Sequence, residues 1–170
     1  HLTRRLTDKI KTWEKAGPSL SRSLHRDILT WVGPWENKID ALKIFSLSHG
    51  DPNPGNIMVQ EEGRLFLLDT GHIRYLPRAL DLYMLEVHLC EDNRGKIKLF
   101  EAAYFKDFSG EAIEAFKATE AFFRLYVFID FATMLARRLA HTAPGGQYYD
   151  EYVSGLARVR QMIAEIAAAR

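Results

Sequence analysis

The sequence predicts an α+β fold that is mainly α-helical and contains one short β-hairpin. Apolar residues recur at helical spacing through most of the chain, whereas two short apolar runs, 57–59 and 65–68, flank a turn that contains a glycine. Segment 49–56, just before the hairpin, holds two prolines and two glycines, so we expect an ordered loop there. The chain has 170 residues, 47% of them hydrophobic, which is enough to bury a core.

The first elements are expected to be helices. Within residues 2–15 the apolar positions are spaced four, four and three apart, which places them on one helical face: Leu2, Leu6, Ile10 and Trp13. The Gly17-Pro18-Ser19 sequence should end this helix and start a second one. Gly33-Pro34 marks another break, followed by a short helix through Ile39 and Leu42.

Residues 44–47 are extended in character and lead into the loop. After about Pro77 every segment is expected to be helical. Ser109 is the expected N-cap of one of these helices, and Pro144-Gly145-Gly146 should separate the last two. The four predicted helical segments are 78–92, 95–106, 110–141 and 147–169.

Composition excludes several classes of protein. The chain has 23 Lys and Arg against 22 Asp and Glu, so a strongly basic nucleic-acid binder is excluded and no nucleic-acid partner is expected. Cys90 is the only cysteine, which excludes an intrachain disulfide and favours a reducing, cytoplasmic location. The most hydrophobic region, 121–136, contains Arg124 and Asp130, so a buried helix is expected there and no transmembrane segment.

Three polar residues flank the hairpin. Asp51 and Asn56 lie in the loop before it, and Asp69 follows its second strand. Because a hairpin returns the chain to its start, these side chains should gather at one end of a small sheet. Carboxylate and amide oxygens are ligands that Mg²⁺ prefers alongside substrate phosphates, and one carboxylate could be left to accept a proton from a hydroxyl group. Each residue taken singly could instead be an ordinary turn residue.

These residues carry a resemblance to a known superfamily. His49-Gly50-Asp51 followed by Asn56 resembles the catalytic loop of protein-kinase-like enzymes, and Asp69-Thr70-Gly71 matches their metal-binding Asp-x-Gly. The glycine after the histidine and the Pro-Gly-Asn that closes the loop resemble the catalytic loop of aminoglycoside phosphotransferases and choline-kinase-type small-molecule kinases. A fainter resemblance is to the lipopolysaccharide core sugar kinases.

The resemblance implies a role for each residue. Asp51 would be the catalytic aspartate that orients an acceptor hydroxyl, with His49 bracing the loop backbone beside it. Asn56 and Asp69 would bind the Mg²⁺ that bridges the phosphates of ATP or GTP. Asp81 would hold the catalytic loop, although it could equally be an ordinary acid in the first turn of a helix. The implied reaction moves the γ-phosphate to a hydroxyl of a small molecule or sugar.

The match is expected to cover only part of a kinase-like fold. Thr70 stands where an aromatic or hydrophobic residue is common, and no Gly-x-Gly-x-x-Gly occurs in the chain. We therefore expect residues 1–170 to form a kinase-like C-terminal lobe without the N-terminal nucleotide lobe, which would be its partner in the same protein. Such a lobe alone should be inactive. Its expected parts are helices over 2–43, the catalytic loop and metal hairpin over 44–71, and a helical subdomain over 77–169.

Two alternatives to a kinase stay open. One is a pseudokinase or binding module that keeps the fold without catalysis. The other is an all-helical interaction domain whose motif match is accidental. A hairpin between residues 57 and 68 separates the last alternative from the others, because an all-helical domain would lack it. Charged residues after the metal motif (His72, Arg74 and Arg78) could face a substrate phosphate or sugar, or could simply be exposed charges.

Overall fold

A computed structural model of the chain describes residues 2–16, 22–35, 38–39, 45–91, 93–146 and 149–168. It divides into two compact units. Unit 1 combines His1–Ala41 with Leu125–Arg170, and unit 2 is Leu42–Arg124. The predicted class is confirmed, because the chain is mainly helical with a few short strands in small antiparallel sheets. In the described part of the chain, no helix is long and apolar enough to cross a membrane.

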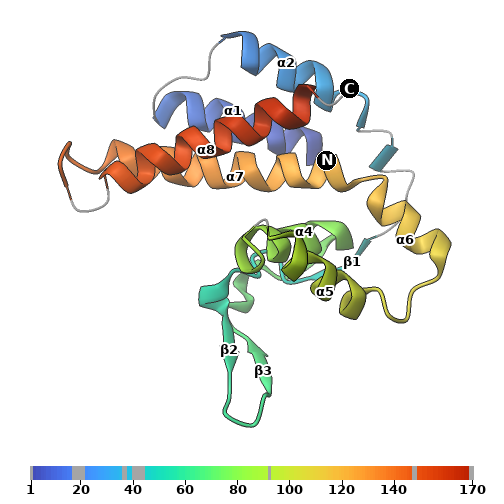
Figure 1. The fold of residues 1–170 in the computed structure, drawn as a ribbon. Helices are drawn as coiled ribbons and strands as arrows, with labels where there is room; N and C mark the ends of the chain where they lie inside the picture. The colour runs from blue at the N-terminus through green and yellow to red at the C-terminus, as the bar shows by residue number, and fades with distance from the viewer. Residues whose placement is uncertain are drawn as a thin grey trace. The chain divides into compact units, whose positions relative to one another are not determined.

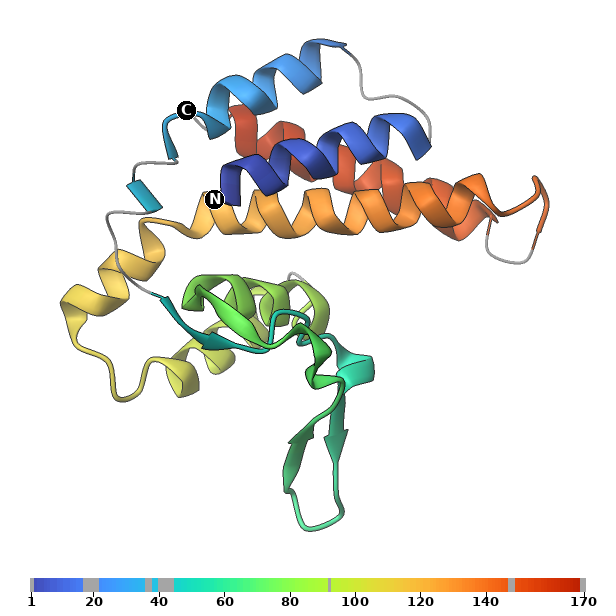
Figure 2. The same cartoon turned by 180° about the vertical axis from the view of Figure 1, so that it is seen from behind.

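Unit 1 is built from helices. It contains α1 (Leu2–Ala16), α2 (Arg22–Val32), most of α7 (Glu120–Ala140) and α8 (Tyr149–Ala168). Figures 1 and 2 show α1, α7 and α8 running alongside one another, with α2 packed on α1 and α8. The apolar face predicted for the first helix is largely confirmed, since three of its members are fully buried: Leu6, Ile10 and Trp13.

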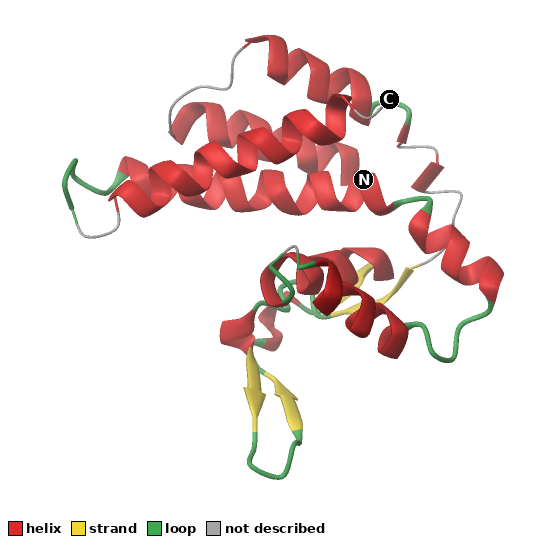
Figure 3. Ribbon diagram, in the orientation of Figure 1, coloured by secondary structure: helices red, strands yellow, loops and turns green. Residues whose placement is uncertain are grey.

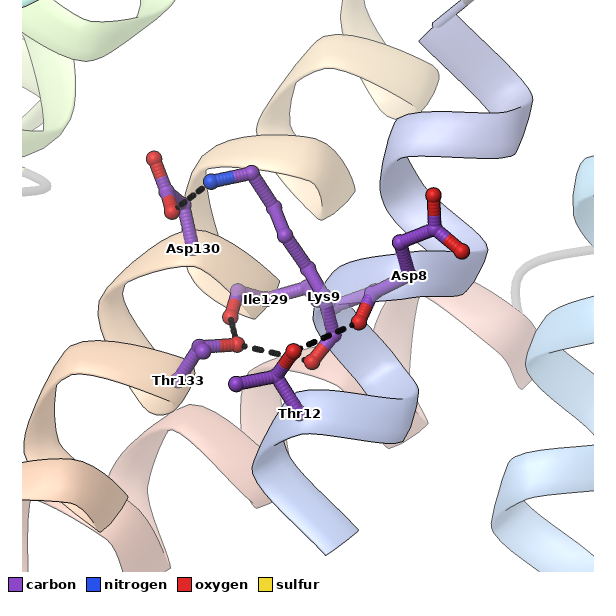
Figure 4. Close-up of polar contacts among 6 residues, drawn as sticks. All are labelled: Asp8, Lys9, Thr12, Ile129, Asp130 and Thr133. Carbon is purple, nitrogen blue, oxygen red and sulfur yellow. Dashed lines mark hydrogen bonds and ion pairs between the residues drawn. The ribbon is translucent and has the colours of Figure 1, made fainter. Parts of the chain in front are cut away.

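Polar contacts also join α1 to α7 (Figure 4). The ammonium group of Lys9 forms an ion pair with the carboxylate of Asp130. One turn further along α7, the Thr133 hydroxyl lies 3.2 Å from the backbone oxygen of Lys9 and 2.8 Å from that of Ile129. Asp130, which interrupts the most hydrophobic stretch of the sequence, is therefore paired with a cation within unit 1.

Unit 2 contains two separate antiparallel sheets. Strand β1 (Phe45–Ser48) pairs with β4 (Arg74–Pro77), and β2 (Ile57–Val59) pairs with β3 (Leu65–Leu67) to form the predicted hairpin. The hairpin turn depends on Gly63, whose φ of 77° lies in the left-handed region. Figure 3 shows the hairpin projecting from the rest of unit 2. Its presence excludes the all-helical alternative.

Helices complete unit 2 around an aromatic core. They are α4 (Arg78–Leu89), α5 (Arg94–Tyr104) and α6 (Gly110–Lys117), and α4 packs on both β1 and β4. As predicted, the Ser109 side chain caps α6, accepting a hydrogen bond from the backbone N–H of Ala112 at 3.2 Å. The aromatic rings of four residues contact one another at centroid distances of 5.1–6.1 Å: Tyr104, Phe105, Phe108 and Phe116.

One prediction about secondary structure is wrong, and one strand was not predicted. The segment 110–141, expected to form one helix, is two helices, because the chain turns at Ala118 and Thr119. There the Thr119 hydroxyl and backbone N–H both bond the carbonyl of Phe116, at 2.7 and 2.9 Å, which ends the regular helical pattern. Strand β4 was not predicted; it is four residues long and ends at Pro77, so its sequence gives little periodicity. The predicted break at residues 17–19 lies outside the described residues, as do Leu42 and Ile44.

Buried Tyr83 is expected to make the stability of unit 2 sensitive to alkaline pH. The side chain is 1% exposed, and its hydroxyl donates to the Phe116 carbonyl at 3.3 Å. Burial, followed by the nearby carboxylates of Glu120 and Glu86, raises the pKa of Tyr83 well above its ordinary value. A raised pKa in the folded state means that stability is fully present below about pH 10 and falls as the pH rises above it, because only the unfolded state ionises readily.

The test is urea unfolding of Tyr83→Phe at about pH 8 and about pH 11. At the lower pH we expect the free energy of unfolding of the variant to be about 1 kcal/mol below that of the parent, because the weak hydrogen bond is lost. Between the lower and the higher pH, the variant should lose less stability than the parent does. Tyr75→Phe is the control, because Tyr75 is 71% exposed. An equal alkaline loss in the parent and in Tyr83→Phe would contradict this account.

Candidate active site

The loop that follows β1 turns sharply at Gly50. This residue has a φ of 81°, and a Cβ atom placed on it would lie 2.6 Å from the carbonyl oxygen of His72. The backbone of the loop therefore passes directly over the turn of the Asp-x-Gly motif, the 3-10 helix η2 (Thr70–His72). Only glycine fits this position without a shift of one backbone segment.

Asp81, in the first turn of α4, contacts the same loop. Its Oδ2 accepts a hydrogen bond from the backbone N–H of His49 at 2.7 Å, and its Oδ1 accepts one from the N–H of Gly50 at 3.0 Å. One carboxylate thus binds two consecutive backbone donors, and such charge-assisted bonds are stronger than neutral ones. The structure places Asp81 beneath the loop that precedes Asp51.

The imidazole of His49 connects the loop to the end of the hairpin. Its Nε2 lies 2.7 Å from the carbonyl oxygen of Leu68, and its Nδ1 lies 3.4 Å from the backbone nitrogen of Asp51. A carbonyl only accepts and a backbone N–H only donates, so these partners assign a neutral ring with its proton on Nε2. The side chain is 7% exposed. His49 therefore touches both segments that carry the predicted metal-site and catalytic residues.

Asn56 lies between Asp51 and the hairpin. It ends the 3-10 helix η1 (Pro54–Asn56), and its side-chain nitrogen donates to the backbone oxygen of Asp51 at 2.9 Å and, more weakly, to Oδ2 of Asp51 at 3.4 Å. Its backbone oxygen accepts from the N–H of Leu68 at 2.8 Å. Leu68 is thus held on both sides, through its N–H by Asn56 and through its carbonyl by His49.

Asp69 follows directly after that fixed residue. Its backbone is in the left-handed region, with φ 53° and ψ 64°, and its side chain caps no helix. Non-glycine residues in this conformation are uncommon, and they concentrate where surrounding structure holds them. Asp69 is exposed, whereas Asp51 and Asn56 are half-buried. The two predicted metal ligands, Asn56 and Asp69, are therefore linked through the main chain of Leu68.

The donor atoms at this position fit a hard cation shared with phosphates. Asn56 uses its side-chain nitrogen toward Asp51, and across the described residues neither its Oδ1 nor the Asp69 carboxylate has a hydrogen-bond partner. Among the described residues no group of three or more His, Cys, Asp or Glu side chains could hold a metal on its own. Mg²⁺ commonly takes only one or two protein carboxylates and completes its shell with water and substrate phosphates.

A groove lies on unit 2 beside the loop, with a volume of about 320 Å³. His49, Pro52 and Asp81 border it on the loop side. The rest of its wall comes from β1, from Leu67 of β3, from α4, and from the end of α5 with the segment after it. It was not predicted from the sequence, because its lining comes from residues spread between Ser46 and Phe108. Of the three charged residues after the metal motif that could face a substrate, Arg78 lines the groove. His72 and Arg74 are exposed and do not line it.

Gly50→Ala is expected to disturb the loop. The left-handed φ alone costs a residue with a side chain about 1–2 kcal/mol, and the close approach to the His72 carbonyl adds to it. Chemical unfolding should therefore show a loss of at least that size. Gly110→Ala is the matched control, because a Cβ there meets nothing within 4 Å. Equal stability of Gly50→Ala and the parent would show that the loop tolerates a different path.

A known protein family matches the segment of the chain that carries the loop and the hairpin. Residues 39–99, which contain His49, Asp51, Asn56, Asp69 and Asp81, match the family described as ABC1 atypical kinase-like domain. This segment resembles a kinase-like domain. Over 55 residues the chain is 33% identical to Protein ACTIVITY OF BC1 COMPLEX KINASE 1, chloroplastic, from Arabidopsis thaliana. That match covers 31% of this chain and 8% of the relative, and no solved structure matches the chain.

The comparisons support the resemblance to the protein-kinase-like superfamily, and the type of kinase within it stays a prediction. The family matched is a kinase-like one, in agreement with the resemblance carried by Asp51, Asn56 and Asp69. They do not specify the aminoglycoside phosphotransferase or choline-kinase type, and the sugar-kinase alternative is likewise untested. The relative is named as chloroplastic, so the cytoplasmic location expected for this chain also stays a prediction.

Proposed function

We propose that this chain forms part of a phosphotransferase that uses Mg²⁺ and ATP, or GTP, to phosphorylate a hydroxyl group of a small molecule or sugar. The observation that carries the proposal is the shared main-chain anchor at Leu68. Through it Asn56 and His49, which flank the Asp51 loop, are bonded to the residue immediately before Asp69. Phosphoryl transfer depends on positioning and charge stabilisation, and a fixed set of this kind can supply both.

Asp51 is proposed to orient the acceptor hydroxyl and accept its proton. The loop holds this carboxylate through the backbone, since His49 and Asn56 bond the Asp51 main chain and Asp81 bonds the two residues before it. The weak contact of Oδ2 with Asn56 leaves Oδ1 without a hydrogen-bond partner among the residues described. That oxygen is available for a hydroxyl donor.

Asn56 and Asp69 are proposed to hold the cation through Oδ1 and the carboxylate, respectively. When bound, Mg²⁺ would neutralise charge on the nucleotide phosphates. The kinase named in the matched relative supports a nucleotide-dependent reaction, although that match covers a small part of the relative. Binding of the nucleotide base and sugar is expected to require parts of the whole protein other than residues 39–99.

Nucleotide binding by the whole protein tests this assignment. Isothermal titration with Mg-ATP and with Mg-GTP should show binding that Asp69→Asn weakens at least tenfold, because the variant removes a charged ligand worth more than about 1.4 kcal/mol. Mg²⁺ without nucleotide should bind more weakly, since the protein offers so few ligands. Asp150→Asn is the control, an exposed aspartate in α8 that has the same charge change.

The same titration distinguishes the proposed phosphotransferase from the remaining alternative. A pseudokinase or binding module with no nucleotide site would give no heat with either Mg-nucleotide, and that result would contradict the proposal. Equal affinity in the parent and in Asp69→Asn would also contradict it, because the nucleotide would then bind without this carboxylate.

A further inference from the structure

Two side chains that line the groove beside the loop carry hydrogen-bond donors without a partner among the described residues. Arg78, the first residue of α4, and Tyr104, the last residue of α5, both line it. Arg78 is exposed, and within the described chain it forms no ion pair. The Tyr104 hydroxyl likewise has no hydrogen-bond partner among the described residues. Two donors on one groove wall select for a ligand that brings acceptor atoms.

The acid among the groove-lining residues is Asp81, and its carboxylate is already hydrogen-bonded. Both of its oxygens accept hydrogen bonds from the loop backbone, one from His49 and one from Gly50. It lies among the groove-lining residues without forming an ion pair with Arg78. Arg78 therefore forms no ion pair with the acidic residue that shares its groove, and among the described residues its guanidinium has no bonded partner.

Tyr104 stays protonated and thus remains a donor at neutral pH. Burial raises the pKa of Tyr104; the Arg78 charge lowers it in part, and the Asp81 charge raises it. Arg78, Asp81 and Tyr104 all line the same groove. The hydroxyl can accordingly donate to an anionic oxygen bound at Arg78.

The rest of the groove combines apolar side chains with four polar ones, Ser46, Ser48, His49 and Asp81. The ring of Tyr104 stacks on that of Phe108 at a centroid distance of 5.6 Å and an interplanar angle of 28°. Leu47, Leu67 and Leu85 line the groove as well, and Leu47 is 72% exposed. A space of about 320 Å³ lined by aromatic and aliphatic side chains, with a few polar groups, has the size and composition of a small-molecule site.

We propose that this groove binds a small molecule with a flat apolar body and one anionic group, a carboxylate or a phosphate. The body lies against Tyr104 and Phe108, and the anion accepts hydrogen bonds from Arg78 and Tyr104. The proposal goes beyond phosphoryl transfer and does not depend on it, because none of the predicted metal ligands lines the groove. His49 and Asp81 do border it, so a bound ligand would contact residues that hold the Asp51 loop.

Binding of matched probes to the whole protein tests the proposal without Mg²⁺ or nucleotide. The anionic probes are 1-naphthoate and 1-naphthyl phosphate, and the neutral probe with the same ring system is 1-naphthol. Titration calorimetry should give tighter binding for at least one anionic probe than for 1-naphthol, and the tighter of the two identifies the preferred anion. Inorganic phosphate alone should bind much more weakly, because it makes no contact with the aromatic wall.

Variants locate the binding in the groove. Arg78→Gln should weaken the anionic probe at least tenfold, Arg78→Lys should restore part of that loss, and neither should change the affinity for 1-naphthol. Tyr104→Phe keeps the ring contacts and should cost about three- to tenfold. Arg74→Gln, an exposed cation on β4 outside the groove, should leave binding unchanged.

Three results would overturn the proposal. One is that neither anionic probe binds. Another is that 1-naphthol binds as tightly as the anions. That result would show that the groove binds the ring system alone and that Arg78 does not contribute to binding. The third is an equal effect of Arg74→Gln and Arg78→Gln, which would indicate general attraction to surface charge. Unfolding curves of Arg78→Gln and Tyr104→Phe, measured in parallel, show whether a loss of binding follows from a loss of fold.

Discussion

Asp51→Asn in the whole protein is expected to lower kcat by about 10²–10⁴-fold, while Mg-nucleotide binding stays within about threefold of the parent. The variant keeps the shape of the side chain and removes the group proposed to accept the acceptor proton. The backbone contacts of the loop from His49, Asn56 and Asp81 do not involve the charge of Asp51, so the loop should keep its path. Steady-state kinetics and nucleotide titration on the same sample separate chemistry from binding.

Asp150→Asn serves as the matched control, because it makes the same change on an exposed position of α8. Its kcat should equal that of the parent. Undiminished turnover in Asp51→Asn would contradict the role assigned to this carboxylate. A loss of nucleotide affinity as large as the loss of kcat would instead place Asp51 in nucleotide binding.

Asp81→Asn is expected to lower the free energy of unfolding by about 2–4 kcal/mol. The carboxylate accepts from two backbone N–H groups, and an amide offers a single oxygen and places its own N–H₂ against the second donor. Hydrogen bonds to a charged group contribute about 1.5–3 kcal/mol each, and a half-buried donor left without a partner adds a desolvation cost. Chemical denaturation at neutral pH measures the difference.

Hydrogen exchange identifies where that stability is lost. The amide protons of His49 and Gly50 should exchange faster in Asp81→Asn than in the parent under conditions where unit 2 stays folded. Asp107→Asn is the control, since Asp107 is exposed and has no bonded partner among the described residues. Unchanged protection at His49 and Gly50 would show that the loop is held by other contacts.

Local sequence patterns predicted the elements in which periodicity or turn chemistry is strong. The apolar spacing of Leu6, Ile10 and Trp13 identified α1, and the glycine turn at Gly63 between two apolar runs identified the hairpin. Strand β4 has no such pattern. It exists because Arg74–Pro77 pairs with β1, nearly 30 residues earlier in the chain, and pairing at that distance leaves no periodic trace in four residues.

The sequence predicts which residues form the candidate site but not the contacts that connect them. The motif spacing selected Asp51, Asn56 and Asp69, and hairpin geometry predicted that they would gather. The sequence could not show that the main chain of Leu68 is the link, since a backbone contact does not depend on residue identity. The groove was missed because its lining residues are spread along the chain: Arg78 and Tyr104 come from different helices, α4 and α5, and no motif links them.

The central claim is that Asn56 and Asp69 hold the cation and Asp51 faces the transferred phosphoryl group. A crystal structure of the whole protein with Mg²⁺ and a non-hydrolysable ATP analogue tests it most directly. We predict Mg²⁺ bound by Oδ1 of Asn56 and by the Asp69 carboxylate, with the γ-phosphate nearest to Asp51. A nucleotide whose metal contacts neither Asn56 nor Asp69 would contradict the account.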